Sequence, residues 1–247
     1  MLTFTEFIEE REAIRLKKEA GEPRPWTTDP VLHATRFTNI NRNNDRGTVE
    51  LFRKVKGLNK AAMINITVLF RTCYSSLLLL DKLTGDDLAL LNSLRGQRLT
   101  KRMPYNVWLY DGITMIDYLI VTAMPVAEYI IDHIDGWSNR SILNVGNEIG
   151  EVYGRTSPRR MFFIGTEIAK DLSVLTPQHV DPLSKCRLNC GAIKGLKLVD
   201  RSIDQLLKTT GLSYSVLEHA LCEYGKYVER SKASRLCTQW IYAPSRI

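Results

Sequence analysis

Apolar residues recur at helical spacing along most of this chain. In the opening segment they form a loose stripe among many charged residues, namely Phe4, Phe7, Ile8, Ile14 and Leu16. Spacings of three and four residues place such side chains on one face of a helix. Comparable patterns predict helices over residues 3–20, 43–56, 58–83, 113–134, 138–152, 159–172, 196–208 and 213–231. No segment alternates convincingly as a strand would, so the pattern predicts an all-α fold.

Local signals set the expected ends of these helices. Thr3 and Glu6 have capping-box spacing, and Ser157-Pro158 combines an N-cap with a first-turn proline. Gly57 separates two predicted helices, and Pro125 predicts a kink or break in another. Residues 174–194 lack a sustained period and indicate a long loop, while residues 96–106 are typical of a loop or short hairpin. We expect a single helical domain of about eight to ten helices over residues 1–247.

The composition is that of an ordinary globular protein. Of the 247 residues, 44% are hydrophobic and 25% are charged, which predicts a folded, soluble chain. The odd number of cysteines and the lack of a secretory signal predict a reducing, cytoplasmic location. Asn65 and Arg71 interrupt the apolar stretch 61–80, so a buried core helix is expected there and no membrane span.

The net charge of +7 suits a polyanionic partner. Lys and Arg side chains that contact phosphates displace condensed counterions from nucleic acid. Basic residues gather within 54–60, 95–102, 155–160 and 185–197. Charge alone favours nucleic-acid binding only slightly, because many basic proteins bind none.

The common enzyme signatures are missing. The chain has no phosphate-binding loop of the G-x-x-x-x-G-K-[ST] type, no G-x-G-x-x-G, no H-E-x-x-H and no G-x-S-x-G. Its four histidines are far apart, and Cys186 and Cys190 have no cluster of partner ligands nearby. No metal site is expected, and residue patterns alone predict only a basic helical protein.

Three segments carry candidate chemistry, and the first follows Trp26. Within eleven residues it holds Arg36, Asn39, Arg42, Asp45 and Arg46, which is too polar a set for a core face. One interpretation is a solvated turn with local salt bridges. The other is an anion-binding cup in which Asp45 orients an arginine that binds phosphate as a bidentate fork.

The other two segments lie later in the chain. On a helix, Glu167 and Asp171 would share one face beside Lys170, so one carboxyl group could have a raised pKa and act as a general base. A charged, exposed helix face is the alternative. Gly191 and Gly195 flank Lys194 before a predicted helix, where the backbone could approach a phosphate closely. A plain helix-entry loop is the alternative there.

Together the segments resemble the phage α-glutamyl/putrescinyl thymine pyrophosphorylases, also called amino acid:DNA transferases, and the helical domain found with 5-hydroxymethyluracil DNA kinases. The matching motifs are W-T-x-D-P from Trp26, R-F-x-N-x-x-R-x-x-D-R from Arg36, E-I-A-K-D-L from Glu167, G-A-I-K-G-L from Gly191, and E-H-A-L-C-E-Y-G-K-Y from Glu218, which contains Cys222, Glu223 and Lys226. They run in order over residues 25–227. Ala192 and Gly225 stand where the family has Ser and Asp.

The resemblance implies a helical fold related to helix-hairpin-helix DNA glycosylases and a role in thymine hypermodification. In that pathway a kinase pyrophosphorylates 5-hydroxymethyluracil in DNA, and a transferase replaces the pyrophosphate with an amino acid or polyamine. The implied partners are double-stranded DNA with modified pyrimidines, the amine co-substrate and the base kinase. No cofactor is implied with certainty, and a divalent metal beside the pyrophosphate is left open.

On this basis the chemistry can be assigned to residues. Arg36, Arg42, Arg46 and Lys194 would neutralise the departing pyrophosphate, and Glu167 or Asp171 would accept the proton of the amine. Trp26 would stack on the unstacked base. Three other interpretations stay open: a non-catalytic DNA-binding partner of a base kinase, a glycosylase-like enzyme that excises the base, and a helical interaction protein without DNA affinity. The residues do not name the amine.

Overall fold

The computed structural model describes residues 1–73, 75–97, 114–156 and 161–241. These residues are mostly helical, which confirms the all-α prediction. The chain divides into two compact units, residues 1–45 with 188–247 and residues 46–187. The expected single domain over residues 1–247 stays a prediction, because this division does not show whether the units fold independently.

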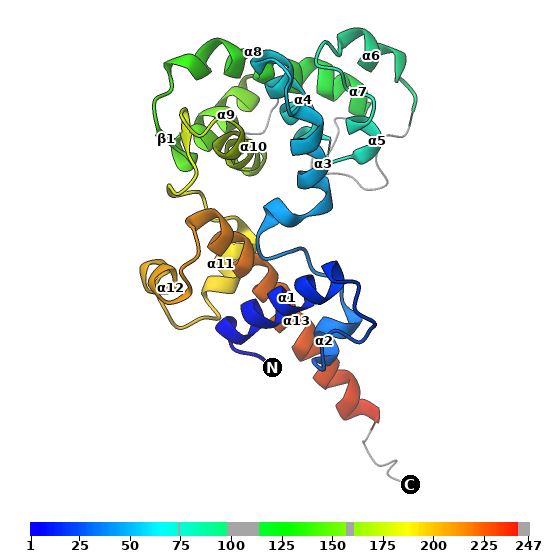
Figure 1. Ribbon diagram of the computed structural model, residues 1–247, viewed down its shortest axis with the longest axis vertical. Helices are drawn as coiled ribbons and strands as arrows, with labels where there is room; N and C mark the ends of the chain where they lie inside the picture. The colour runs from blue at the N-terminus through cyan, green and yellow to red at the C-terminus, as the bar shows by residue number, and fades with distance from the viewer. Residues whose placement is uncertain (74, 98–113, 157–160, 242–247) are drawn as a thin grey trace. The chain divides into compact units, whose positions relative to one another are not determined.

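The first unit is built from both ends of the chain. Its helices are α1 (Phe4–Glu19), α2 (Pro30–Ala34), the 3-10 helix η1 (Arg42–Asn44), α11 (Cys190–Leu196), α12 (Ile203–Thr210) and α13 (Tyr214–Ile241). Helix α13 packs against α1, α2, α11 and α12 (Figure 1). Aromatic side chains pack together within the largely aliphatic core of this unit: the ring centroid of Phe7 lies 5.5 Å from that of Tyr224 and 5.2 Å from that of Tyr227. The predicted capping box of Thr3 and Glu6 is confirmed.

The second unit contains the central part of the chain. Its helices are α3 (Arg46–Val55), α4 (Lys60–Thr72), α5 (Leu77–Leu80), α6 (Leu88–Ser93), α7 (Met115–Tyr118), the π-helix η2 (Leu119–Ala123), α8 (Met124–His133), the 3-10 helix η3 (Ile134–Gly136), α9 (Ile142–Thr156) and α10 (Phe162–Leu175). Helix α4 is buried from Met63 to Thr72, which confirms the buried helix expected within 61–80.

Helices α9 and α10 of this unit approach each other closely. A Cβ atom added at Gly165 would lie 2.3 Å from the carbonyl oxygen of Gly146, and one at Gly150 would lie 2.5 Å from Phe162 Cδ1. The two backbones approach so closely because these three positions carry no side chain. Beside this pair, the strands β1 (Arg140–Ser141) and β2 (Val180–Asp181) are parallel, with Arg140 opposite Val180.

Several predicted boundaries are wrong by a few residues or more. The region 43–56 begins as η1 before α3, and 58–83 divides into α4 and α5, with a left-handed residue at Ser75 (φ 55°) between them. The expected loop 174–194 contains the end of α10, β2 and the start of α11. These elements are too short for a periodic pattern and depend on tertiary contacts. The helix expected from residue 138 begins at Ile142, after β1.

One break is placed as predicted: Gly57 (φ 81°) separates α3 from α4. Pro125 lies in the first turn of α8, and no break occurs there, because α7, η2 and α8 follow one another without a gap from Met115 to His133; the irregularity is the π-helical turn η2 just before it. The Ser157-Pro158 cap and most of the loop predicted over 96–106 lie outside the described residues. Among the helices that the structure describes, none has the length and apolar character that crossing a membrane requires.

Candidate functional site

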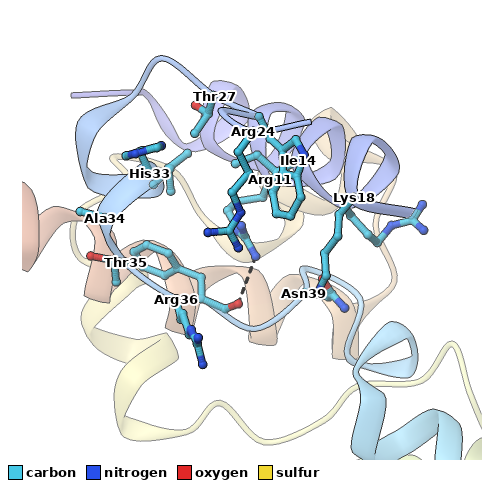
Figure 2. A pocket seen from close by; sticks show the side chains of 14 residues that line it. Arg11, Ile14, Lys18, Arg24, Thr27, His33, Ala34, Thr35, Arg36 and Asn39 are labelled. Carbon is cyan, nitrogen blue, oxygen red and sulfur yellow. Dashed lines mark hydrogen bonds between the residues drawn. The ribbon is translucent and has the colours of Figure 1, made fainter. Parts of the chain in front are cut away.

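A cavity of about 530 Å³ lies in the first unit, lined only by residues between 11 and 39 (Figure 2). Five of its fourteen lining residues are Lys or Arg, and no carboxylate is among them. The lining residues are Arg11, Ile14, Arg15, Lys18, Arg24, Trp26, Thr27, Leu32, His33, Ala34, Thr35, Arg36, Phe37 and Asn39. The pocket therefore combines strong positive charge with two aromatic side chains.

Helix α1 supplies one wall of this pocket. Arg11, Arg15 and Lys18 are spaced by four and three residues, so they share a face of the helix. Arg15 forms ion pairs with Glu12 and Glu19, which raise the pKa of its guanidinium. The i, i+4, i+7 spacing of these cations indicates a shared helix face, but it does not indicate that this face lines a cavity.

Arg11 is the buried cation of the pocket, with 7% of its surface exposed. Its Nη2 donates to the carbonyl oxygens of Phe37 and Thr38, at 3.2 and 3.1 Å. Burial lowers the pKa of the guanidinium, and the negative charges of Glu223 and Asp45 oppose that effect. Its Nε has no hydrogen-bond partner among the residues that the structure describes.

Trp26 forms part of the wall with Arg24. The guanidinium of Arg24 lies over the Trp26 ring, 4.6 Å from its centroid, and the indole N–H donates to the Glu22 carbonyl oxygen at 2.7 Å. The Trp26 carbonyl oxygen in turn accepts a hydrogen bond from Lys17 Nζ at 3.0 Å. Since Arg24 covers one face of the ring, the predicted stacking of a base on Trp26 would have to use the opposite face.

The predicted anion-binding cup is only partly assembled. Arg36 and Asn39 line the pocket, whereas Arg42, Asp45 and Arg46 are not among its lining residues. Asp45 accepts a hydrogen bond from the Asn39 backbone N–H at 2.9 Å, so it holds the turn that follows the pocket. Arg42 is buried and begins η1, and Arg46 begins α3 of the second unit. Phosphate contacts for these two arginines stay a prediction.

Two carboxylates of the motif on α13 bind backbone N–H groups elsewhere in the first unit. Glu223, only 2% exposed, accepts a hydrogen bond from the Thr38 backbone N–H at 3.2 Å. It also forms an ion pair with Lys226. Glu218 accepts a hydrogen bond from the Asn189 backbone N–H at 3.3 Å. These contacts join segments about 30 to 185 residues apart in sequence. Spacing within the motif could not reveal them.

The interpretation of Gly191, Lys194 and Gly195 as a loop before a helix is corrected. All three lie within α11. A Cβ atom at Gly195 would lie 1.9 Å from the carbonyl oxygen of Leu221, and one at Gly191 would lie 2.5 Å from Cys222 Sγ. The glycines therefore let α11 pack against α13. Lys194 is exposed, and its Nζ lies 4.0 Å from Glu229.

Glu167 and Asp171 lie on a largely buried part of α10, and not on an exposed charged face. Asp171, 1% exposed, accepts hydrogen bonds from Arg71 at both oxygens, at 2.9 Å between Arg71 Nη2 and Asp171 Oδ1. Arg71 also donates to Thr48 Oγ1 at 3.0 Å. Glu167 forms an ion pair with the buried Lys170, at 2.9 Å between Lys170 Nζ and Glu167 Oε1. The ion pair accounts for Asp171 structurally, and catalytic roles for either carboxylate stay predictions.

No group of three or more His, Cys, Asp or Glu side chains that could hold a metal ion occurs in the part of the chain that the structure describes. The pocket itself offers nitrogen donors on cationic groups and few oxygen ligands. Its chemistry therefore suits an anion directly.

Residues 1–80 match the family model of the 5-hmdU DNA kinase helical domain. This match covers about a third of the chain, and all residues that line the pocket lie within it. Neither the curated proteins nor the solved structures give a significant match.

Proposed function

We propose that this chain takes part in thymine modification in phage DNA, exchanging the pyrophosphate on 5-hydroxymethyluracil for an amine. One observation carries the proposal: the region that matches the 5-hmdU DNA kinase helical domain also forms the cation-lined pocket. The ordered motifs on α10, α11 and α13 support the finer assignment to an amino acid:DNA transferase.

The reaction makes a clear demand on the protein. The amine nitrogen attacks the methylene carbon at C5, the bond from that carbon to the pyrophosphate oxygen breaks, and the amine loses a proton to a base. Negative charge grows on the departing pyrophosphate, so cations held beside it lower the barrier. Arg36, predicted for this task, lines the pocket together with Arg11 and Arg24. The base must leave the DNA stack to expose its methylene group.

A product analysis tests this proposal. The full chain is incubated with duplex DNA containing pyrophosphorylated 5-hydroxymethyluracil and a mixture of amino acids and polyamines, and the nucleosides are then analysed by mass spectrometry. The proposal expects a thymidine derivative that carries an amine at its 5-methylene group. Abasic sites would instead indicate base excision, and unchanged nucleosides under all conditions would contradict the transferase assignment.

A non-catalytic role is the second candidate. The net charge of +7 and the match to a kinase helical domain favour a DNA-binding partner of a base kinase. Such a partner would bind DNA with an affinity that falls steeply with salt, and it would leave the nucleosides unchanged. The same incubation, repeated with the kinase present, separates this role from catalysis.

A further inference from the structure

The cation of Arg11 is held under unusual conditions. It lies at the pocket with 7% of its surface exposed, and its two hydrogen bonds go to neutral carbonyl oxygens. A guanidinium carries five N–H donors, and a buried donor without a partner costs free energy. Within the described residues Nε has no hydrogen-bond partner. Because Nε is itself buried, an anion in the pocket would contact Arg11 through the part of the side chain that is still exposed there.

The charge around Arg11 favours the same ligand. Lys18, Arg24 and Arg36 are exposed at the pocket, and no Asp or Glu lines it. The two carboxylates that act on the Arg11 charge, Glu223 and Asp45, are not among the lining residues, and Lys226 forms an ion pair with Glu223. The cavity therefore has an excess of positive charge that a ligand with one negative charge would not balance.

We propose that this pocket is a binding site for a diphosphate group, with Arg11 as its buried binding residue and Arg24 as its exposed one. This assignment deepens the proposed function and rests on it for the source of the ligand, which is the diphosphate carried by the modified base. Planar guanidinium groups fit phosphate oxygens as forks. Figure 2 shows the side chains of Arg11 and Arg24 both extending among the lining residues, with the hydrogen bond from Arg11 to the Phe37 carbonyl oxygen.

The size of the cavity fits a larger group than the diphosphate alone. Ligand pockets in proteins commonly measure several hundred Å³, and this one measures about 530 Å³. The side chains of Trp26, Phe37 and Ile14 supply apolar surface beside the cations. A pyrimidine attached to the diphosphate would find both kinds of contact there.

The same charges exclude one class of ligand. A polyamine carries positive charge at neutral pH, so it is repelled by a pocket that holds several cations and no carboxylate. If a polyamine is the co-substrate, only its uncharged attacking amine reaches the methylene carbon at this pocket, and its second, charged amino group binds outside it. Putrescine is therefore expected not to compete with the diphosphate.

Binding of inorganic pyrophosphate to the full chain tests the site without any DNA chemistry. Calorimetric titration at low salt, free of divalent metals, compares the wild type with R24Q, R11K and a matched control, R53Q. Arg53 is exposed on α3 of the other unit and pairs with Glu50. We expect about a tenfold weaker affinity for R24Q and R11K, the effect of losing one charge-assisted hydrogen bond, and no change beyond about twofold for R53Q.

Each outcome decides something. Equal affinities of R24Q and the wild type, or an equal loss in R53Q, would overturn the site. If R11K unfolds, as circular dichroism would show, R24Q alone decides. Displacement of pyrophosphate by unmodified duplex DNA would assign the pocket to backbone phosphates and overturn its assignment to the base. Pocket-dependent pyrophosphate binding together with a negative transfer assay would reject the proposed function and leave the site standing.

Discussion

At Gly195 the space that a methyl group would need is filled by the main chain of α13, 1.9 Å from the ideal Cβ position. Gly195→Ala must push α11 away from α13, and overpacking of this kind costs about 1–3 kcal/mol or more. Ile193→Ala, on the exposed face of the same helix, is the matched control and is expected to change stability by less than about 1 kcal/mol. Urea denaturation measures both. Equal stability of Gly195→Ala and the wild type would contradict the close approach.

Cys73 gives a residue-level prediction that depends on pH. Burial raises the pKa of its thiol to about 12. The unfolded chain releases this proton near pH 9, so the free energy of unfolding falls as pH rises from about 9 toward 12. Between pH 8 and pH 10, the wild type is expected to lose about 1–2 kcal/mol more than Cys73→Ala in urea denaturation. The same loss in both proteins would show that the thiol is not shielded.

At the scale of elements, the ion pair between Arg71 and Asp171 joins α4 to α10. Asp171→Asn leaves a buried guanidinium without its counter-charge, which typically costs about 3–5 kcal/mol. Asp132→Asn, on an exposed position of α8, is the control and should be neutral. Thermal denaturation compares the two. A catalytic Asp171 without this structural role would instead give Asp171→Asn normal stability and no transfer activity.

Helices could be predicted from the sequence better than the contacts between them, because the signals for a helix are local and those for a contact are not. Helical periodicity, the Thr3 capping box and the Gly57 break depend on residues a few positions apart, and the structure confirms them. Close helix crossings depend on pairs such as Gly146 and Gly165, which no local pattern connects. Strands of two residues also give no periodic signal, so β1 and β2 were not expected.

The candidate site divides in the same way. Arg36, Asn39 and Trp26 were predicted because they lie near one another in sequence, and they do line the pocket. Arg11 was missed because it reaches the pocket only through the packing of α1 on the extended segment at Phe37. A cluster of polar residues can be found in the sequence, whereas the cavity that such residues line cannot be predicted from it.

At the scale of the whole molecule, the first unit depends on contacts between the two ends of the chain. Tyr227, fully buried, donates to Asp29 Oδ2 at 2.8 Å and accepts from the Leu2 backbone N–H at 2.9 Å. Tyr227→Phe is expected to lower the free energy of unfolding by about 1–3 kcal/mol. Tyr224→Phe, which loses one hydrogen bond of 3.2 Å, should lose less. The opposite order in urea denaturation would contradict this arrangement.

In the proposed transfer, amine addition and pyrophosphate release are one reaction, supported by the pocket of the first unit. Its most direct test counts both products in a single turnover on DNA containing pyrophosphorylated 5-hydroxymethyluracil. We expect one pyrophosphate released for each amine incorporated, and a rate at least about tenfold lower for R24Q than for R53Q. Pyrophosphate release without amine incorporation, or equal rates for the two variants, would contradict it.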